Sequence, residues 1–415
     1  MALATHSETK VDSSLAPFYF IYMGGGSLLS WNAILNSLDY FSSKFPKNDI
    51  NFMFPVAFYL AQFLSSLVIT KLSAILMLNV RLIGAFLIAS VLLVLLPIEA
   101  EVFAQTNFGF ILVMLMLFIL GICANICLST MTGLSSQLPG KYSAYTLLGT
   151  SVTALFLSIL REISSLVFKS ESKEDNISVV IFFGVTAAYI LGCIVFQTIF
   201  TKTEFFIVYL RQSEKVQMID SSREASLLLT EDEEEKPTYP RNISTFLMIF
   251  REVKIYVILY VVTALQIYTI FPGVILKKPM IGIDEEIKVV STVMTFNVSQ
   301  MFGKILGKYR KFYSLSTVFG VIIFRFVLMG LIIAQAATTS IPILDTIWFG
   351  YLTTALFGLT VGFVMVGLTV LAPEKVDPAK KEIVGHVSIF GINTGVLLGT
   401  FVALPFAFLL KTKKE

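Results

Sequence analysis

The stretch that decides the fold class is residues 108–127, FGFILVMLMLFILGICANIC, which carries no charged side chain. A helix of about 20 mostly apolar residues spans the hydrocarbon core of a bilayer. This stretch lies in the apolar segment 108–133, and ten further segments of the chain have the same character: 17–38, 53–71, 79–98, 143–168, 178–201, 254–276, 288–306, 312–337, 346–372 and 385–410. The sequence therefore predicts an all-α polytopic membrane protein with 11 transmembrane helices.

The composition of the whole chain agrees with this class. Hydrophobic residues make up 56% of the 415 residues, charged residues only 14%, and the mean hydropathy is +0.81. A soluble domain carries about 25% charged residues, because its surface must be solvated. The composition therefore excludes a soluble protein.

Several functional classes lack the residues that they need. The three cysteines, Cys123, Cys127 and Cys193, lie inside apolar runs, where cysteine acts as a small hydrophobic residue. The chain has two histidines and neither an HExxH nor a CxxC pattern, so we expect no metal ion and no cofactor. No basic cluster is typical of nucleic-acid binding. The spans carry no nucleophile–base set either, so we do not expect an enzyme.

One connection between the apolar segments differs from the rest. Positions 201–254 hold 18 charged residues, including the acidic run EDEEE at 231–235. Such a segment buries too little apolar surface to fold alone, so we predict a disordered cytoplasmic loop over 202–253. It divides the chain into an N-terminal bundle of six helices, 17–201, and a C-terminal bundle of five, 254–410.

The distribution of lysine and arginine predicts the orientation. A cytoplasmic N-terminal tail, residues 1–16, places 18 of these residues on the inside and nine outside, and the long loop contributes most of the excess. The tail 411–415 is then extracellular. Two bundles joined by a long middle loop are typical of secondary transporters, which bind substrate near the midplane between the bundles. We expect a monomer in the plasma membrane that contacts lipid and a small-molecule substrate.

The segment 288–306 contains the richest set of polar residues inside a span. Asn297, Gln300 and Lys304 fall within about 60° of one another on a helix, so they form one polar stripe. Ionisable residues inside a membrane are costly and mark functional sites. We expect Gln300 to offer its carbonyl to the Lys304 ammonium. The alternative is that Lys304 extends to the cytoplasmic interface.

The first segment contains residues 24–32, GGGSLLSWN. Its three glycines weaken the helix and permit bending or close packing. Trp31 lies mid-span rather than at the interface where tryptophan is usual, so its ring is a candidate for stacking on a planar ligand. Packing between helices is the alternative role.

Other features of the spans favour structural roles. Pro272 and Gly273 predict a bend in the segment 254–276. Glycines 391, 395 and 399 form a small-residue face that favours close helix packing. Arg325 and the Arg161–Glu162 pair are expected to form structural ion pairs or interface anchors, and His386 is a weaker candidate for proton coupling.

Five stretches, taken in order, resemble the equilibrative nucleoside transporter family. Residues 26–32 (GSLLSWN) look like its helix 1 motif G-x-L-L-P-W-N, and residues 137–142 (QLPGKY) resemble its loop between helices 4 and 5. Residues 297–304 (NVSQMFGK) are similar to its helix 8 motif N-x-x-D-x-x-G-R. Residues 372–378 (APEKVDP) resemble the loop before its last helix, and glycines 395 and 399 follow at the expected place.

This resemblance implies an 11-helix relative of the major facilitator fold that moves nucleosides or nucleobases by alternating access. It implies a substrate site whose residues are Trp31, Leu28, Leu35, Asn297, Gln300, Lys304 and Ile392. By the resemblance, Trp31, Leu28 and Leu35 line the base side, and the polar stripe lies near the ribose or the polar base edge. Ile392 matches an apolar lining position, and Leu128 stands where some members have glutamine.

Three positions depart from the family motifs. Ser30 replaces a proline, so we expect a straighter first helix. Gln300 replaces an acid and Lys304 an arginine, so the stripe keeps a net positive charge and loses the forked geometry that suits a diol. We infer tolerance of free nucleobases or preference for an acceptor-rich ligand. The loss of the acid favours facilitated diffusion of purines, and a proton-coupled major-facilitator carrier of another solute such as a sugar is the alternative.

Overall fold

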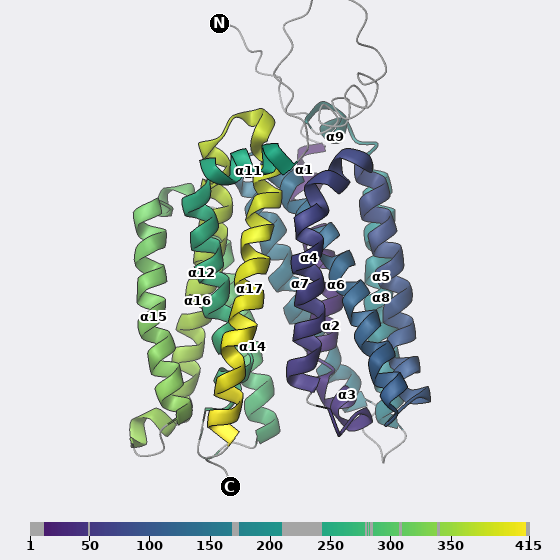
Figure 1. Cartoon of the computed structure of the whole chain (residues 1–415), viewed down its shortest axis with the longest axis vertical. Coiled ribbons are helices and arrows are strands. Elements are labelled where there is room, and N and C mark those ends of the chain that lie inside the picture. Colours follow the sequence, from purple (N-terminus) through teal and green to yellow (C-terminus); the bar gives the residue numbers. More distant parts are fainter. Residues whose placement is uncertain are drawn as a thin grey trace, which may run out of the picture.

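The structure is a computed structural model that describes residues 12–411 apart from 49, 168–173, 210–242, 279, 281, 283–284, 307–308 and 338–340. All regular secondary structure in these residues is helical. Figure 1 shows long helices, roughly parallel or antiparallel, in two groups that lie side by side. The predicted all-α membrane architecture is confirmed at this level.

The N-terminal group contains the helices from Asp12 to Tyr209. Their bounds are α1 (Asp12–Ser27), α2 (Leu29–Leu35), α3 (Leu38–Lys44), α4 (Ile50–Ile75), α5 (Leu78–Val102), α6 (Asn107–Ser136), α7 (Gly140–Val167), α8 (Glu174–Phe200) and α9 (Glu204–Tyr209). Its core is rich in aromatic side chains. Phe20, Phe41, Phe54 and Phe58, for example, are fully buried.

The C-terminal group begins at Ile243. Its α-helices are α11 (Ile243–Glu252), α12 (Lys254–Ile270), α13 (Gly273–Leu276), α14 (Glu285–Ile305), α15 (Leu315–Ala337), α16 (Ile347–Leu371) and α17 (Lys381–Lys411). Short 3-10 turns, η2 (Arg310–Phe312), η3 (Pro342–Asp345), η4 (Pro373–Lys375) and η5 (Pro378–Lys380), lie between the last helices.

Within the described residues, nine helices are long and apolar enough to cross a membrane, and they correspond to nine of the 11 expected segments. The two others are 17–38 and 288–306. The first is divided between α1 and α2 by a break at Leu28, and neither piece is long enough alone. The second is α14, whose polar stripe and acidic first turn lower its hydropathy.

The bend expected at Pro272 and Gly273 occurs, and the expectation of a straighter first helix is wrong. Helix α12 ends at Ile270 and α13 begins at Gly273, as the Pro-Gly pair predicts. The first helix is not straight although Ser30 replaces a proline, because the chain leaves helical geometry at Leu28. Just before this break α1 packs very closely on α7: a Cβ at Gly24 would collide with the Thr146 carbonyl.

The predicted loop over 202–253 needs a correction at both ends. Helix α9 lies at its start and α11 at its end, and its centre, 210–242, falls outside the described residues. Both helices bury apolar side chains, Phe206 of α9 and Ile249 of α11. Short charged stretches can therefore be helical here, because the adjoining bundles cover one side of each helix.

The two groups meet along α17, α14 and α16 of the C-terminal group and α4, α6 and α7 of the N-terminal group. Within its own group α17 also packs tightly on α12. A Cβ at Gly395 would collide with the Val261 carbonyl, and one at Gly399 with that of Leu265. The predicted small-residue packing face is confirmed.

Candidate functional site

The polar stripe of α14 faces the other bundle because glycines hold the opposite side of the helix against α16. A Cβ at Gly303 would collide with the Leu359 carbonyl, and one at Gly362 of α16 with the Gln300 carbonyl. Such backbone-to-backbone contact leaves no room for polar side chains on that face. The side chains of Gln300 and Lys304 therefore lie toward α7.

Lys304 crosses the interface between the bundles. Its Nζ donates a hydrogen bond of 2.8 Å to Thr150 Oγ1 on α7, and the residue is only 6% exposed. Thr150 lies ten residues into α7, about 15 Å along the helix axis at 1.5 Å per residue. Lys304 is therefore inside the bundle interface, and the alternative that it extends to the interface with water does not describe this structure.

Gln300 is also held from the opposite bundle. Ser151 Oγ donates a hydrogen bond of 2.8 Å to Gln300 Oε1. The expected contact between the Gln300 carbonyl and Lys304 is therefore wrong, because α7 supplies the partners of both side chains. Asn297, one turn earlier on α14, is buried at 8% exposure.

The Lys304 ammonium is held by a hydroxyl and not by a carboxylate. In the described part of the chain, none of the ion pairs includes it. A cation without a counter-ion in a low-dielectric interior is costly, and an anionic or acceptor-rich group brought next to it would be stabilised. The site can therefore favour ligands with carbonyl, ring-nitrogen or hydroxyl oxygen acceptors.

Trp31 of α2 lies in an aromatic cluster. Its ring is 4.9 Å from that of Phe58 and 4.8 Å from that of Tyr59, both on α4, and it is 7% exposed. The Tyr59 ring continues the cluster across the interface, at 5.0 Å from the Tyr268 ring on α12. The structure thus places Trp31 in helix packing, one ring away from the opposite bundle.

The other predicted apolar residues take different positions. Leu35 packs against the cores of both bundles, and Ile392 of α17 likewise touches the N-terminal core and its own. Leu28 is half-buried at the break between α1 and α2. Four of the seven predicted residues, namely Gln300, Lys304, Leu35 and Ile392, therefore meet the opposite bundle directly.

Sequence reasoning missed the partners that α7, α4 and α6 contribute. Thr150 and Ser151 gave little signal, because a hydroxyl inside a membrane helix usually bonds its own backbone, as Thr150 does with the Leu147 carbonyl. Asn393 donates a hydrogen bond of 2.7 Å to Asn125 Oδ1 of α6 across the same interface. An amide inside an apolar run was the signal for this second contact.

The two arginines that were expected to form structural ion pairs or interface anchors have different partners. Arg161 forms an ion pair as expected, but the partner is Asp39, at 3.1 Å, which was not predicted from the sequence. Arg325 is fully buried but belongs to no ion pair within the described residues, so that expectation is wrong. Its Nη2 donates a 3.4 Å hydrogen bond to the Thr263 carbonyl, and its guanidinium lies 5.2 Å from the Phe357 ring.

His386 is buried on α17, where a Cβ at Gly133 of α6 would lie 3.0 Å from its Nε2. Leu128, at the position of the family glutamine, is buried on α6. Within the described ranges, no group of three or more His, Cys, Asp or Glu residues could hold a metal ion.

Comparison with known sequences gives one family. A family model described as "Nucleoside transporter" matches residues 113–409. The chain is 24% identical over 403 residues to equilibrative nucleotide transporter 1 of Arabidopsis thaliana, covering 93% of this chain and 85% of that protein. It is 20% identical over 430 residues to equilibrative nucleoside transporter 4 of Danio rerio, covering 93% and 82%.

Comparison with solved structures gives the fold. A major facilitator superfamily proton:xylose symporter, XylE, superposes with a TM-score of 0.65 at 14% identity, covering 97% of this chain and 90% of that one. The E. coli fucose:proton symporter FucP has a TM-score of 0.57 at 12% identity, covering 99% and 100%.

Proposed function

The chain belongs to the nucleoside transporter family, and we propose that it moves nucleosides and free nucleobases, mainly purines, by alternating access and without proton coupling. The observation that carries this proposal is the contact of Gln300 and Lys304 with Ser151 and Thr150 across the two bundles. A ligand with several acceptors can replace the two hydroxyls at these side chains.

The proposed architecture has 11 spans, six and then five. The first span consists of α1 and α2, which meet at the break at Leu28, and α14 is the eighth span. Irregular or polar segments are tolerated at membrane depth where other helices enclose them, and both of these contact α7. Residues 17–201 and 254–410 are the bundles, with both 202–253 and the N-terminus in the cytoplasm and the C-terminus outside.

The position of the cross-bundle hydrogen bonds supports the proposal of alternating access. Lys304 bonds Thr150, Ser151 bonds Gln300, and Asn393 bonds Asn125, while Gln137 at the end of α6 donates a 3.3 Å bond to Glu382. By the helix bounds, all four lie in the halves that contain the C-terminal ends of α6 and α14 and the N-terminal ends of α7 and α17. Opening that end requires breaking them, and the bundles would then rock about the proposed site.

The proposed site contains Trp31, Leu28, Leu35, Asn297, Gln300, Lys304 and Ile392. We assign the base to the aromatic cluster that contains Trp31, whose Tyr59 ring meets Tyr268 of the opposite bundle, because aromatic rings stack on flat ligands. We assign the polar edge or ribose to the α14 stripe, which supplies donors. Replacement of Trp31 by Ala should raise the half-saturating substrate concentration more than replacement by Phe, measured by concentration-dependent uptake. Equal effects would limit Trp31 to packing.

The function is tested by uptake of labelled adenosine in a transport-deficient host, with unlabelled nucleosides, nucleobases and sugars as competitors. Purine nucleosides and free purines should compete, and sugars should not. Reconstituted protein should also show counterflow in liposomes without a pH gradient. Competition by sugars alone would overturn the substrate class, and uptake that needs a pH step would overturn facilitated diffusion.

One observation favours the proton-coupled alternative. Glu382 and His386 are both buried one turn apart on α17, and Glu382 accepts the hydrogen bond from Gln137 of the other bundle. Titratable groups at a moving interface can couple a proton to transport. Glu382→Gln and His386→Gln should leave uptake insensitive to a pH step if facilitated diffusion is right. A pH-driven accumulation in the wild type that both variants abolish would establish the alternative.

A further inference from the structure

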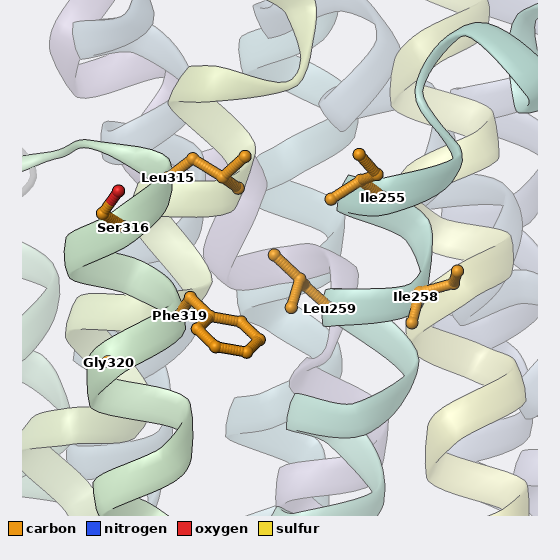
Figure 2. A pocket seen from close by; sticks show the side chains of 7 residues that line it. All are labelled: Ile255, Ile258, Leu259, Leu315, Ser316, Phe319 and Gly320. Carbon is orange, nitrogen blue, oxygen red and sulfur yellow. The ribbon is translucent and has the colours of Figure 1, made fainter.

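A groove opens between α12 and α15 on the perimeter of the C-terminal bundle, and none of the residues that line it belongs to the proposed substrate site. It has a volume of about 450 Å³, within the range of roughly 300–1,000 Å³ of ligand pockets. Its lining is apolar apart from one hydroxyl: Ile255, Ile258, Leu259, Leu315, Ser316, Phe319 and Gly320. Figure 2 shows these side chains on two neighbouring helices, with Leu315, Ser316 and Ile255 at one end.

The groove is hollow because a glycine occupies its wall. A Cβ added at Gly320 would meet nothing within 4 Å. Phe319 beside it is 53% exposed, and Ile258 on the opposite wall is 57% exposed. Large apolar side chains that a neighbouring helix does not cover must be covered by the bilayer, so the occupant has apolar chains.

Two lysines lie just beyond the residues that line the groove, near the beginnings of α12 and α15. Lys254 lies one turn before Ile258 on the same face of α12. Lys311 lies in η2, four residues before Leu315, with its Nζ 5.2 Å from the centre of the Phe312 ring. Both are exposed, and none of the ion pairs among the described residues includes either. The neighbouring Arg310 is different, because both Glu374 carboxylate oxygens accept hydrogen bonds from its guanidinium.

We propose that this groove binds an anionic phospholipid, with an acyl chain between α12 and α15 and the phosphate beside Lys254 and Lys311. Hydrophobic grooves with basic residues at the cytoplasmic end of helices bind acidic headgroups, and the Ser316 hydroxyl adds a donor. The occupant comes from the membrane and is distinct from the transported solute. The lipid would fill the space between α12 and α15 and support their packing.

Native mass spectrometry of the purified protein with added phosphatidylserine or phosphatidylcholine tests whether binding depends on the negative charge of the lipid headgroup. The wild type should retain phosphatidylserine about tenfold better, since each lysine near an anionic headgroup contributes measurably. The double variant Lys254→Gln/Lys311→Gln should bind both lipids equally. Lys71→Gln, an exposed lysine of α4, should keep the preference. An unchanged preference in the double variant would overturn the proposal.

A second pair of variants tests the groove itself. Gly320→Leu fills it with a side chain that meets no other atom at its Cβ, so it should lower retention of both lipids several-fold without unfolding the protein. Gly330→Leu is matched, because it lies on the same helix and its Cβ also meets nothing, but it does not line the groove. Equal retention by the two leucine variants would place the bound lipid elsewhere and contradict the site.

Discussion

Cations at the helix ends of the N-terminal bundle and cations buried inside the C-terminal bundle have different kinds of partner; at its own helix ends the C-terminal bundle also has ion pairs, such as Arg310 with Glu374. In the N-terminal bundle, Lys44 pairs with Glu101 at 2.5 Å and Arg161 with Asp39 at 3.1 Å, and both carboxylates are substantially exposed. In the C-terminal bundle, Lys304 bonds a threonine hydroxyl. Lys278, beyond the end of α13, is held by neutral oxygens of α16: the Gly350 carbonyl at 2.7 Å and Thr354 Oγ1 at 2.8 Å.

This difference distinguishes cations that stabilise helix ends from cations that can bind a ligand. A charge pair at an exposed helix end contributes about 0–1 kcal/mol and leaves no charge for a ligand. A buried ammonium that meets only hydroxyls and carbonyls keeps its charge uncompensated, which is costly unless another group uses it. Lys304 lies at the bundle interface and Lys278 does not, so we expect removal of the first to affect transport and removal of the second to affect stability.

The largest effect is expected for Lys304→Met. A charge-assisted hydrogen bond contributes about 1.5–3 kcal/mol, so its loss should lower labelled purine uptake at least about tenfold. The variant should still reach the membrane, because methionine fills the same volume. Lys71→Met, on the exposed surface of α4, is the control and should transport normally. Normal uptake by Lys304→Met would contradict the distinction between ion-paired cations at helix ends and cations buried among neutral partners.

A smaller effect is expected for the neutral hydrogen bond between Ser151 and Gln300, next to Lys304. Gln300→Ala removes a possible ligand contact as well as the bond to Ser151, whereas Ser151→Ala removes only the bond. We expect a several-fold loss of uptake for Gln300→Ala and about threefold or less for Ser151→Ala, since a neutral hydrogen bond contributes about 0.5–1.5 kcal/mol. Equal losses would mean that Gln300 acts only as a link between the bundles.

Lys278 should affect stability rather than uptake. Burial lowers its pKa from 10.5 to about 7 in the folded protein. Between these values the unfolded chain binds more protons, so the free energy of unfolding rises as pH increases from 7 to 10.5. The melting temperature of the purified protein should rise by a few degrees over this window, and Lys278→Met should lose that rise. The exposed Lys47→Met should keep it.

The smallest effect is expected for Asp39→Asn. Its carboxylate is exposed and its ion pair with Arg161 lies at the end of the N-terminal bundle. Arg161 also donates a 3.2 Å hydrogen bond to the Asn36 carbonyl, so it stays in place without the charge. We expect uptake within twofold of the wild type. A loss as large as that of Lys304→Met would show that the exposed pairs are more than anchors.

Much of the fold could be predicted because a bilayer imposes one simple rule on a spanning segment. Apolar runs of about 20 residues predicted nine of the helices directly, and Pro272 predicted the division of α12 from α13. The break at Leu28 could not be predicted in this way. It follows directly after the close contact of α1 with α7 at Gly24, which joins segments more than 100 residues apart.

The candidate site was predicted in part. The spacing of Asn297, Gln300 and Lys304 was enough to place them on one face of α14, because helical periodicity is local. The predicted ion pair of Arg325 was wrong. A carboxylate partner would have to come from a neighbouring helix, and the sequence does not show which helices are neighbours. None of α12, α15 or α16 carries an acidic residue beside it.

The sequence by itself determined that this chain lies in a membrane, where most of its spans are, and which face of α14 is polar. Hydropathy and helical period are sums over neighbouring residues, so they need no knowledge of the rest of the chain. Only the tertiary structure decided that Lys304 meets Thr150 and Gln300 meets Ser151, residues about 150 positions away. Close glycine contacts between α14 and α16 set which side of α14 stays free, and packing of this kind is not a property of any single segment.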